Sequence, residues 1–61
     1  MRKGTYYIEN TDKLNKTLAL LAITIPCFIE KDGIEMNYSE VTITARIEDF
    51  SMVEKFLAPL V

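Results

Sequence analysis

The chain has 61 residues, of which 49% are apolar and 26% are charged, and its formal net charge is −2. This length allows a single domain spanning residues 1–61, and the apolar content excludes a disordered chain. The acidic balance excludes the broad basic surface that nucleic-acid binding requires, so we expect no nucleic-acid partner.

The first predicted element is a short strand over residues 4–9, where Tyr6 and Ile8 alternate with more polar residues. Asparagine, threonine and aspartate at residues 10–12 then offer a choice of helix N-caps. The following apolar residues recur at helical spacing and predict a helix over residues 11–22. Its buried stripe is expected to consist of Leu14, Leu18, Leu21 and Ala22.

A second strand is predicted over residues 23–30, which read ITIPCFIE. The β-branched residues at its start disfavour a helix, and Pro26 suits an edge strand or the start of a strand. Alternation along this segment places Phe28 on the opposite face from Cys27 and Ile29. We therefore expect Phe28 to project from the outer face of the sheet.

The middle of the chain predicts a hairpin. Residues 31–33 (Lys-Asp-Gly) are typical of a tight turn, and residues 34–38, including Met36, alternate as a returning strand. Residues 41–47 also alternate, with an apolar face expected to point into the core: Val41, Ile43, Ala45 and Ile47. Whether residues 33–47 form one bent strand or two is left open by the sequence.

The last predicted element is a helix that ends near Ala58, before Pro59. Ser51 and Glu54 have the spacing of a capping box, and Asp49 is a competing N-cap. The predicted order is β-α-β-β-β-α. This order predicts an α+β fold with two layers, a mostly antiparallel sheet of 3–4 strands and two helices packed on one face.

The sequence is poor in residues that carry chemistry. Cys27 is the single cysteine and histidine is absent, so neither an intramolecular disulfide nor a structural zinc site is expected. No histidine can activate Cys27, Ser39 or Ser51, and the two glycines belong to no phosphate-binding loop. We therefore expect no enzyme activity, no catalytic residues and no cofactor.

Acidic residues near the predicted turn could suggest a weak calcium site formed by Glu30, Asp32 and Glu35. The spacing does not match an EF-hand loop, so we interpret them as a solvated turn and expect no metal. The uncharged residues 18–29 are too few to cross a bilayer. With its free thiol the chain is expected to be cytoplasmic and without a membrane partner.

Association with another chain is the expected source of additional stability. A domain this small buries only about 60% of the surface that its unfolded chain exposes. With neither disulfide nor metal, a two-fold homodimer is the remaining solution. The outer sheet face, or an exposed edge strand, is expected to form the joint of the dimer. The expected interface residues, for the dimer or for a partner, are Tyr7 and Phe28 on the outer face with Ile23 and Pro26 beside them.

These observations favour a non-enzymatic protein-interaction module that acts as a homodimer. Such a module would serve as an adaptor or inhibitor that binds and occludes another protein. Its short, acidic and motif-poor composition is also typical of small inhibitors encoded by phages or mobile elements. Two alternatives remain: a domain that senses a small molecule in a pocket at the dimer interface, and a structural subunit of a larger complex.

Overall fold

The computed structural model describes residues 1–35 and 37–61, with side chains at all positions except 34–36. The elements in chain order are β1 (Arg2–Glu9), α1 (Asp12–Thr24), β2 (Cys27–Glu35), β3 (Tyr38–Ala45), the 3-10 turn η1 (Ile47–Asp49), α2 (Phe50–Leu57) and the 3-10 turn η2 (Ala58–Leu60).

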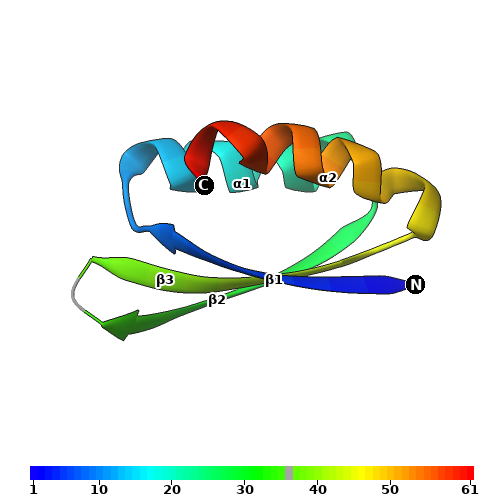
Figure 1. The fold of residues 1–61 in the computed structure, drawn as a ribbon. Helices are drawn as coiled ribbons and strands as arrows, with labels where there is room; N and C mark the ends of the chain where they lie inside the picture. The colour runs from blue at the N-terminus through cyan, green and yellow to red at the C-terminus, as the bar shows by residue number, and fades with distance from the viewer. Residues whose placement is uncertain (36) are drawn as a thin grey trace.

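The sheet has the strand order β1-β3-β2, and both neighbouring pairs are antiparallel. Strand β3 is therefore central, while β1 and β2 run in the same direction along the two edges. Helix α1 connects these edge strands, and both helices lie on the same face of the sheet (Figure 1). The predicted two-layer α+β fold is confirmed.

Helix α1 begins and ends where local chemistry requires. The side chain of Thr11 accepts a hydrogen bond from the backbone N–H of Leu14 and so caps the first turn. The helix ends at Thr24, two residues later than predicted, because Ile25 is extended (φ −133°, ψ 154°) before Pro26. The predicted second strand consequently starts at Cys27 rather than at residue 23.

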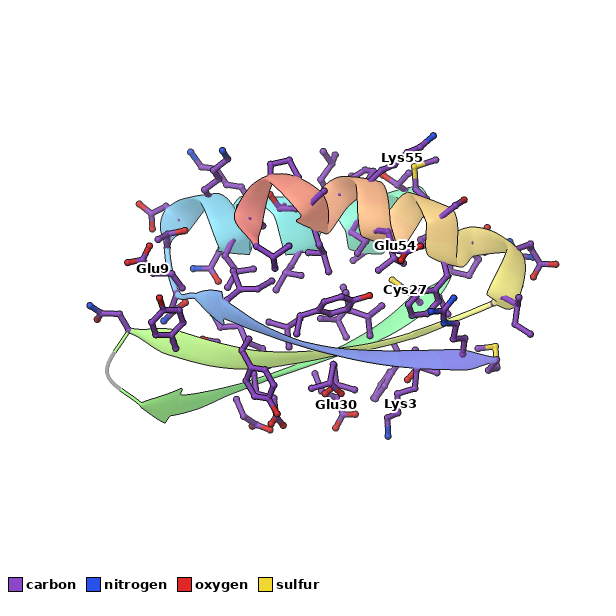
Figure 2. The ribbon with its side chains drawn as sticks, in the orientation of Figure 1. Lys3, Glu9, Cys27, Glu30, Glu54 and Lys55 are labelled. Atoms are coloured by element: carbon purple, nitrogen blue, oxygen red, sulfur yellow. The ribbon has the colours of Figure 1, made fainter. Side chains whose placement is uncertain are left out.

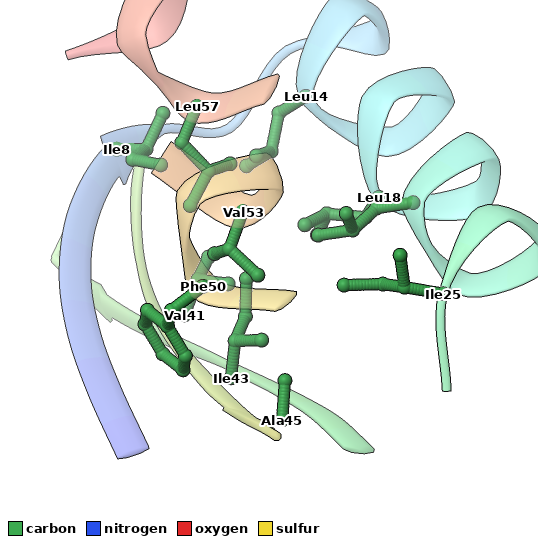
Figure 3. Packing of buried hydrophobic residues seen from close by; sticks show 11 residues of the cluster. Ile8, Leu14, Leu18, Ile25, Val41, Ile43, Ala45, Phe50, Val53 and Leu57 are labelled. Atoms are coloured by element: carbon green, nitrogen blue, oxygen red, sulfur yellow. The ribbon is translucent and has the colours of Figure 1, made fainter. Parts of the chain in front are cut away.

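The core lies between the sheet and the two helices (Figure 3). Helix α1 contributes three leucines of the predicted stripe, whereas Ala22 is exposed. Strand β3 alternates as predicted. The buried apolar residues are Ile8, Leu14, Leu18, Leu21, Ile25, Val41, Ile43, Ala45, Phe50, Val53 and Leu57.

The predicted turn at residues 31–33 is wrong. These residues continue β2, in which Lys31 pairs with Val41 and Gly33 pairs with Ser39 across to β3, with a bulge between Gly33 and Glu35. Pairing along the full length of β3 outweighs the local turn signal. The sheet of the described residues thus has three strands, the lower of the two expected numbers, while the prediction for Met36 lies outside those residues.

The predicted capping box of α2 is also wrong. The helix begins at Phe50, with Asp49 in the N-cap position and Ser51 already inside the first turn. The Asp49 carboxylate accepts a hydrogen bond from Arg46 at 2.7 Å instead of capping the helix. Because β3 ends at Ala45, the alternation stops there, and Ile47 is 70% exposed rather than part of the core.

Candidate interaction surfaces

The outer face of the sheet, which the helices do not cover, is polar in its middle. The strand register places Thr44 between Lys3 and Phe28 in one row across the sheet. In the next row Thr42 lies between Thr5 and Glu30. Figure 2 shows Lys3 and Glu30 on this face, on the side opposite the helices. Hydroxyl and charged groups therefore occupy the centre of this surface.

Tyr7 and Phe28 lie on this face but do not meet. Tyr7 is on edge strand β1 and Phe28 on edge strand β2, four residues apart in register. Strand geometry separates them by about 10 Å across the sheet and about 13 Å along it. The expectation of one apolar patch containing both is therefore incorrect in its geometry, because threonines of β3 lie between them.

The other three predicted interface residues lie on segments that meet at one end of the sheet, with Ile23 in the helix layer and Phe28 on the outer face. Ile23 lies in the last turn of α1, Pro26 in the connection to β2, and Phe28 near the start of β2. Ile23 and Phe28 are 82% and 65% exposed, and Pro26 is exposed as well. Ile47 follows the end of β3, which pairs with the start of β2, so it belongs to the same end.

We call Ile23, Pro26, Phe28 and Ile47 the apolar end. Sequence reasoning missed Ile47, because its place in the alternating sequence 41–47 predicts a buried side chain. The signal against burial was the short distance in sequence to the following helix. That helix begins at Phe50, earlier than a cap at Ser51 predicts. Scattered exposed apolar residues are ordinary, whereas a contiguous apolar patch marks an association surface.

Charged groups border the apolar end. Arg46 follows β3 directly, and its Nε lies 2.7 Å from the Asp49 carboxylate and 3.8 Å from that of Glu48. The hydrogen bond to Asp49 and the charge of that carboxylate raise the pKa of the Arg46 guanidinium above its ordinary value. An apolar centre with a charged border is the usual anatomy of a protein interface.

Cys27 packs against the hydrophobic core. It is half-buried between the sheet and the helix layer (Figure 2). Burial first, and the negative charge of Asp49 second, raise the pKa of the Cys27 thiol above its ordinary value. Nucleophilic cysteines need the opposite shift, toward the thiolate. The geometry therefore gives Cys27 a packing role.

The part of the chain that the structure describes contains no pocket and no cluster of three residues able to hold a metal ion. Glu30 and Asp32 point from the outer face of β2, while the side chain of Glu35 is outside the description. Among the described helices, neither is both long and apolar enough to cross a bilayer.

Comparison of the chain with protein-family models, curated proteins and solved structures finds no match.

Proposed function

We propose that this chain is a non-enzymatic protein-interaction module that acts as a homodimer and binds and occludes a protein partner through its apolar end. The observation that carries the proposal is the exposure of Ile23, Phe28 and Ile47 at the same end of the sheet. Large apolar side chains held in water by a folded scaffold favour association, since each loses unfavourable hydration when a partner covers it.

The apolar end also has the rigidity that an occluding surface needs. Phe28 is fixed by the ladder between β2 and β3, and Ile23 by the last turn of α1. Their backbones lose little conformational freedom on binding, which leaves more of the contact energy for affinity. Binding by shape requires no catalytic group, which accords with the packing role of Cys27.

The test is co-purification with a tagged chain from a lysate of the source cells, comparing matched variants. The first is the double variant Ile23→Ser/Phe28→Ser, which makes the apolar end polar. The control is Tyr38→Ser, which removes an exposed aromatic side chain at the other end of the outer face. Both changes are at exposed positions, so circular dichroism should show intact folds.

We expect the wild type and Tyr38→Ser to retain the same protein and the double variant to lose it. Purified partner then binds the wild type with an affinity that the double variant reduces at least tenfold. If no protein is retained at micromolar bait, or if all three chains retain the same protein equally, this function is wrong.

A further inference from the structure

The edge of β1 is open along its whole length. The eight residues Arg2–Glu9 pair in unbroken register with β3 on one side, without a bulge or a proline. In the sheet of the described residues nothing pairs with the other side of β1. Such an edge presents a row of free backbone donors and acceptors that another strand can use.

The edge of β2 is protected by comparison. Pro26 precedes this strand, and a bulge interrupts it between Gly33 and Glu35. Lys31 faces the helix side of this edge strand, where its Nζ donates a hydrogen bond to Asn15 Oδ1 at 2.6 Å. Proline, bulges and inward-pointing charges are the devices by which proteins prevent strand addition. Arg2 faces the helix side of β1 as Lys31 faces that of β2, so the two edges differ in the bulge and in the proline before β2.

We propose that β1 pairs with β1 of a second copy, antiparallel and centred on Tyr6, and that this is the joint of the homodimer. The joint rests on the homodimer proposed above. In this register Lys3 lies opposite Glu9 of the second copy, and Thr5 lies opposite its Tyr7. Two-fold symmetry repeats both pairs, and Tyr6 lies opposite its own equivalent.

Cross-strand chemistry favours this register. Residues directly opposite one another on the same face interact, and opposite charges, aromatic pairs and aromatic with β-branched residues are the favourable combinations. Lys3 and Glu9 lie at the two ends of β1 (Figure 2). An antiparallel pairing therefore brings the lysine of one copy beside the glutamate of the other. Exposed Tyr7 gains a threonine neighbour in the same step.

Neighbouring registers lose these pairs. Centring on Thr5 places Lys3 opposite Tyr7 of the second copy, and centring on Tyr7 places Thr5 opposite Glu9, so the charges are no longer matched. A parallel pairing brings the basic end of one strand beside the basic end of the other. The alternation of β1 allows only centres that keep side chains of the same face together.

The joint gives the dimer a definite form. The two three-stranded sheets become one continuous sheet, with all helices on the same face. Because the strands run antiparallel, the two apolar ends lie at opposite ends of this sheet and remain accessible. The contact covers less than a standard interface, so the dimer is expected to dissociate on dilution.

Charge reversal tests the register. Lys3→Glu and Glu9→Lys each replace two attractive pairs by two repulsive ones, so each raises the dimer dissociation constant by about tenfold or more. The variants complement each other, and an equimolar mixture forms a heterodimer with the affinity of the wild type. Glu30→Lys, with the same charge change as Glu9→Lys on the β2 edge, leaves dimerisation unchanged. Sedimentation across a dilution series measures the dissociation constant of each of the three variants and of the mixture.

Coupling with a zero-length carbodiimide provides a test on the unaltered protein. A mixture of isotope-labelled and unlabelled chains should give a peptide that joins Lys3 of one copy to Glu9 of the other. Wild type that stays monomeric at millimolar concentration overturns both the joint and the homodimer. A dimer that lacks this peptide, or that only Glu30→Lys weakens, overturns the joint alone. Loss of partner binding in Ile23→Ser/Phe28→Ser concerns only the proposed function.

Discussion

The hydroxyl oxygen of Tyr6 lies 2.9 Å from the position that a Cβ atom would take on Gly4. The ring of Phe50 approaches the same position to 3.0 Å. Glycine thus allows two aromatic side chains to cover the backbone of β1 from the helix side. Arg2 adds to this cover, with its guanidinium 4.7 Å from the centre of the Phe50 ring.

Gly4→Ala is expected to destabilise the fold by about 1–3 kcal/mol, because the added methyl group displaces Tyr6 and presses on the buried ring of Phe50. Chemical denaturation measures this change. Gly33→Ala is the matched control, since a Cβ on Gly33 meets nothing within 4 Å. The control should have nearly unchanged stability, and equal effects of the two substitutions would contradict the role of Tyr6 and Phe50.

Substitutions of Ile43 and Ile47 are expected to differ sharply in their effect on stability, although both residues belong to the alternating sequence 41–47. Ile43 is fully buried, so Ile43→Ala should lower the free energy of unfolding by about 2–5 kcal/mol. Ile47 is exposed, so Ile47→Ala should change it by less than about 0.5 kcal/mol. Thermal melts of both variants decide this, and a large loss in Ile47→Ala would mean that β3 extends further than the structure shows.

Ser39 carries a buried hydroxyl that has no hydrogen-bond partner among the described residues. Ser39→Ala removes this unsatisfied group and should stabilise the fold by up to about 1 kcal/mol. Ser51→Ala is the control, because Ser51 is exposed and does not cap α2. A loss of about 1 kcal/mol in the free energy of unfolding of Ser51→Ala would instead support the capping box formed by Ser51.

Alkylation of Cys27 should follow the burial of its thiol. With its pKa raised by burial and by Asp49, the rate of reaction with iodoacetamide should reach half its maximum at a higher pH than for a free thiol. A midpoint at or below that of a free thiol would contradict the packing role of Cys27.

The same shift makes stability depend on pH. The folded thiol holds its proton more tightly than the unfolded one, so stability is complete below the ordinary thiol pKa and falls as pH rises through the folded pKa. Tyr6 adds to this loss at higher pH, because burial and then Glu54 raise its pKa. Cys27→Ala should reduce the alkaline loss, as measured by denaturation at several pH values.

The sequence by itself determined the elements that local chemistry controls. The leucine spacing of α1, an N-cap among residues 10–12 and the alternation of Val41, Ile43 and Ala45 follow from residue type and period. The structure selects Thr11 as the cap. Phe28 was correctly placed on the outer face because alternation along a strand fixes which side a residue takes. These features and the two-layer class needed no knowledge of distant contacts.

Only the tertiary structure decided where strands end and which surfaces meet. Gly33 remains in β2 because it pairs with Ser39 on β3. A turn signal within residues 31–33 contains no information about this long-range pairing. Ile47 is exposed because the chain leaves the sheet after Ala45, and the Arg46 and Asp49 pair closes that turn. Tyr7 and Phe28 are separated because β3 inserts between β1 and β2. Strand order depends on long-range pairing, and a periodic pattern along one segment contains no information about its neighbour.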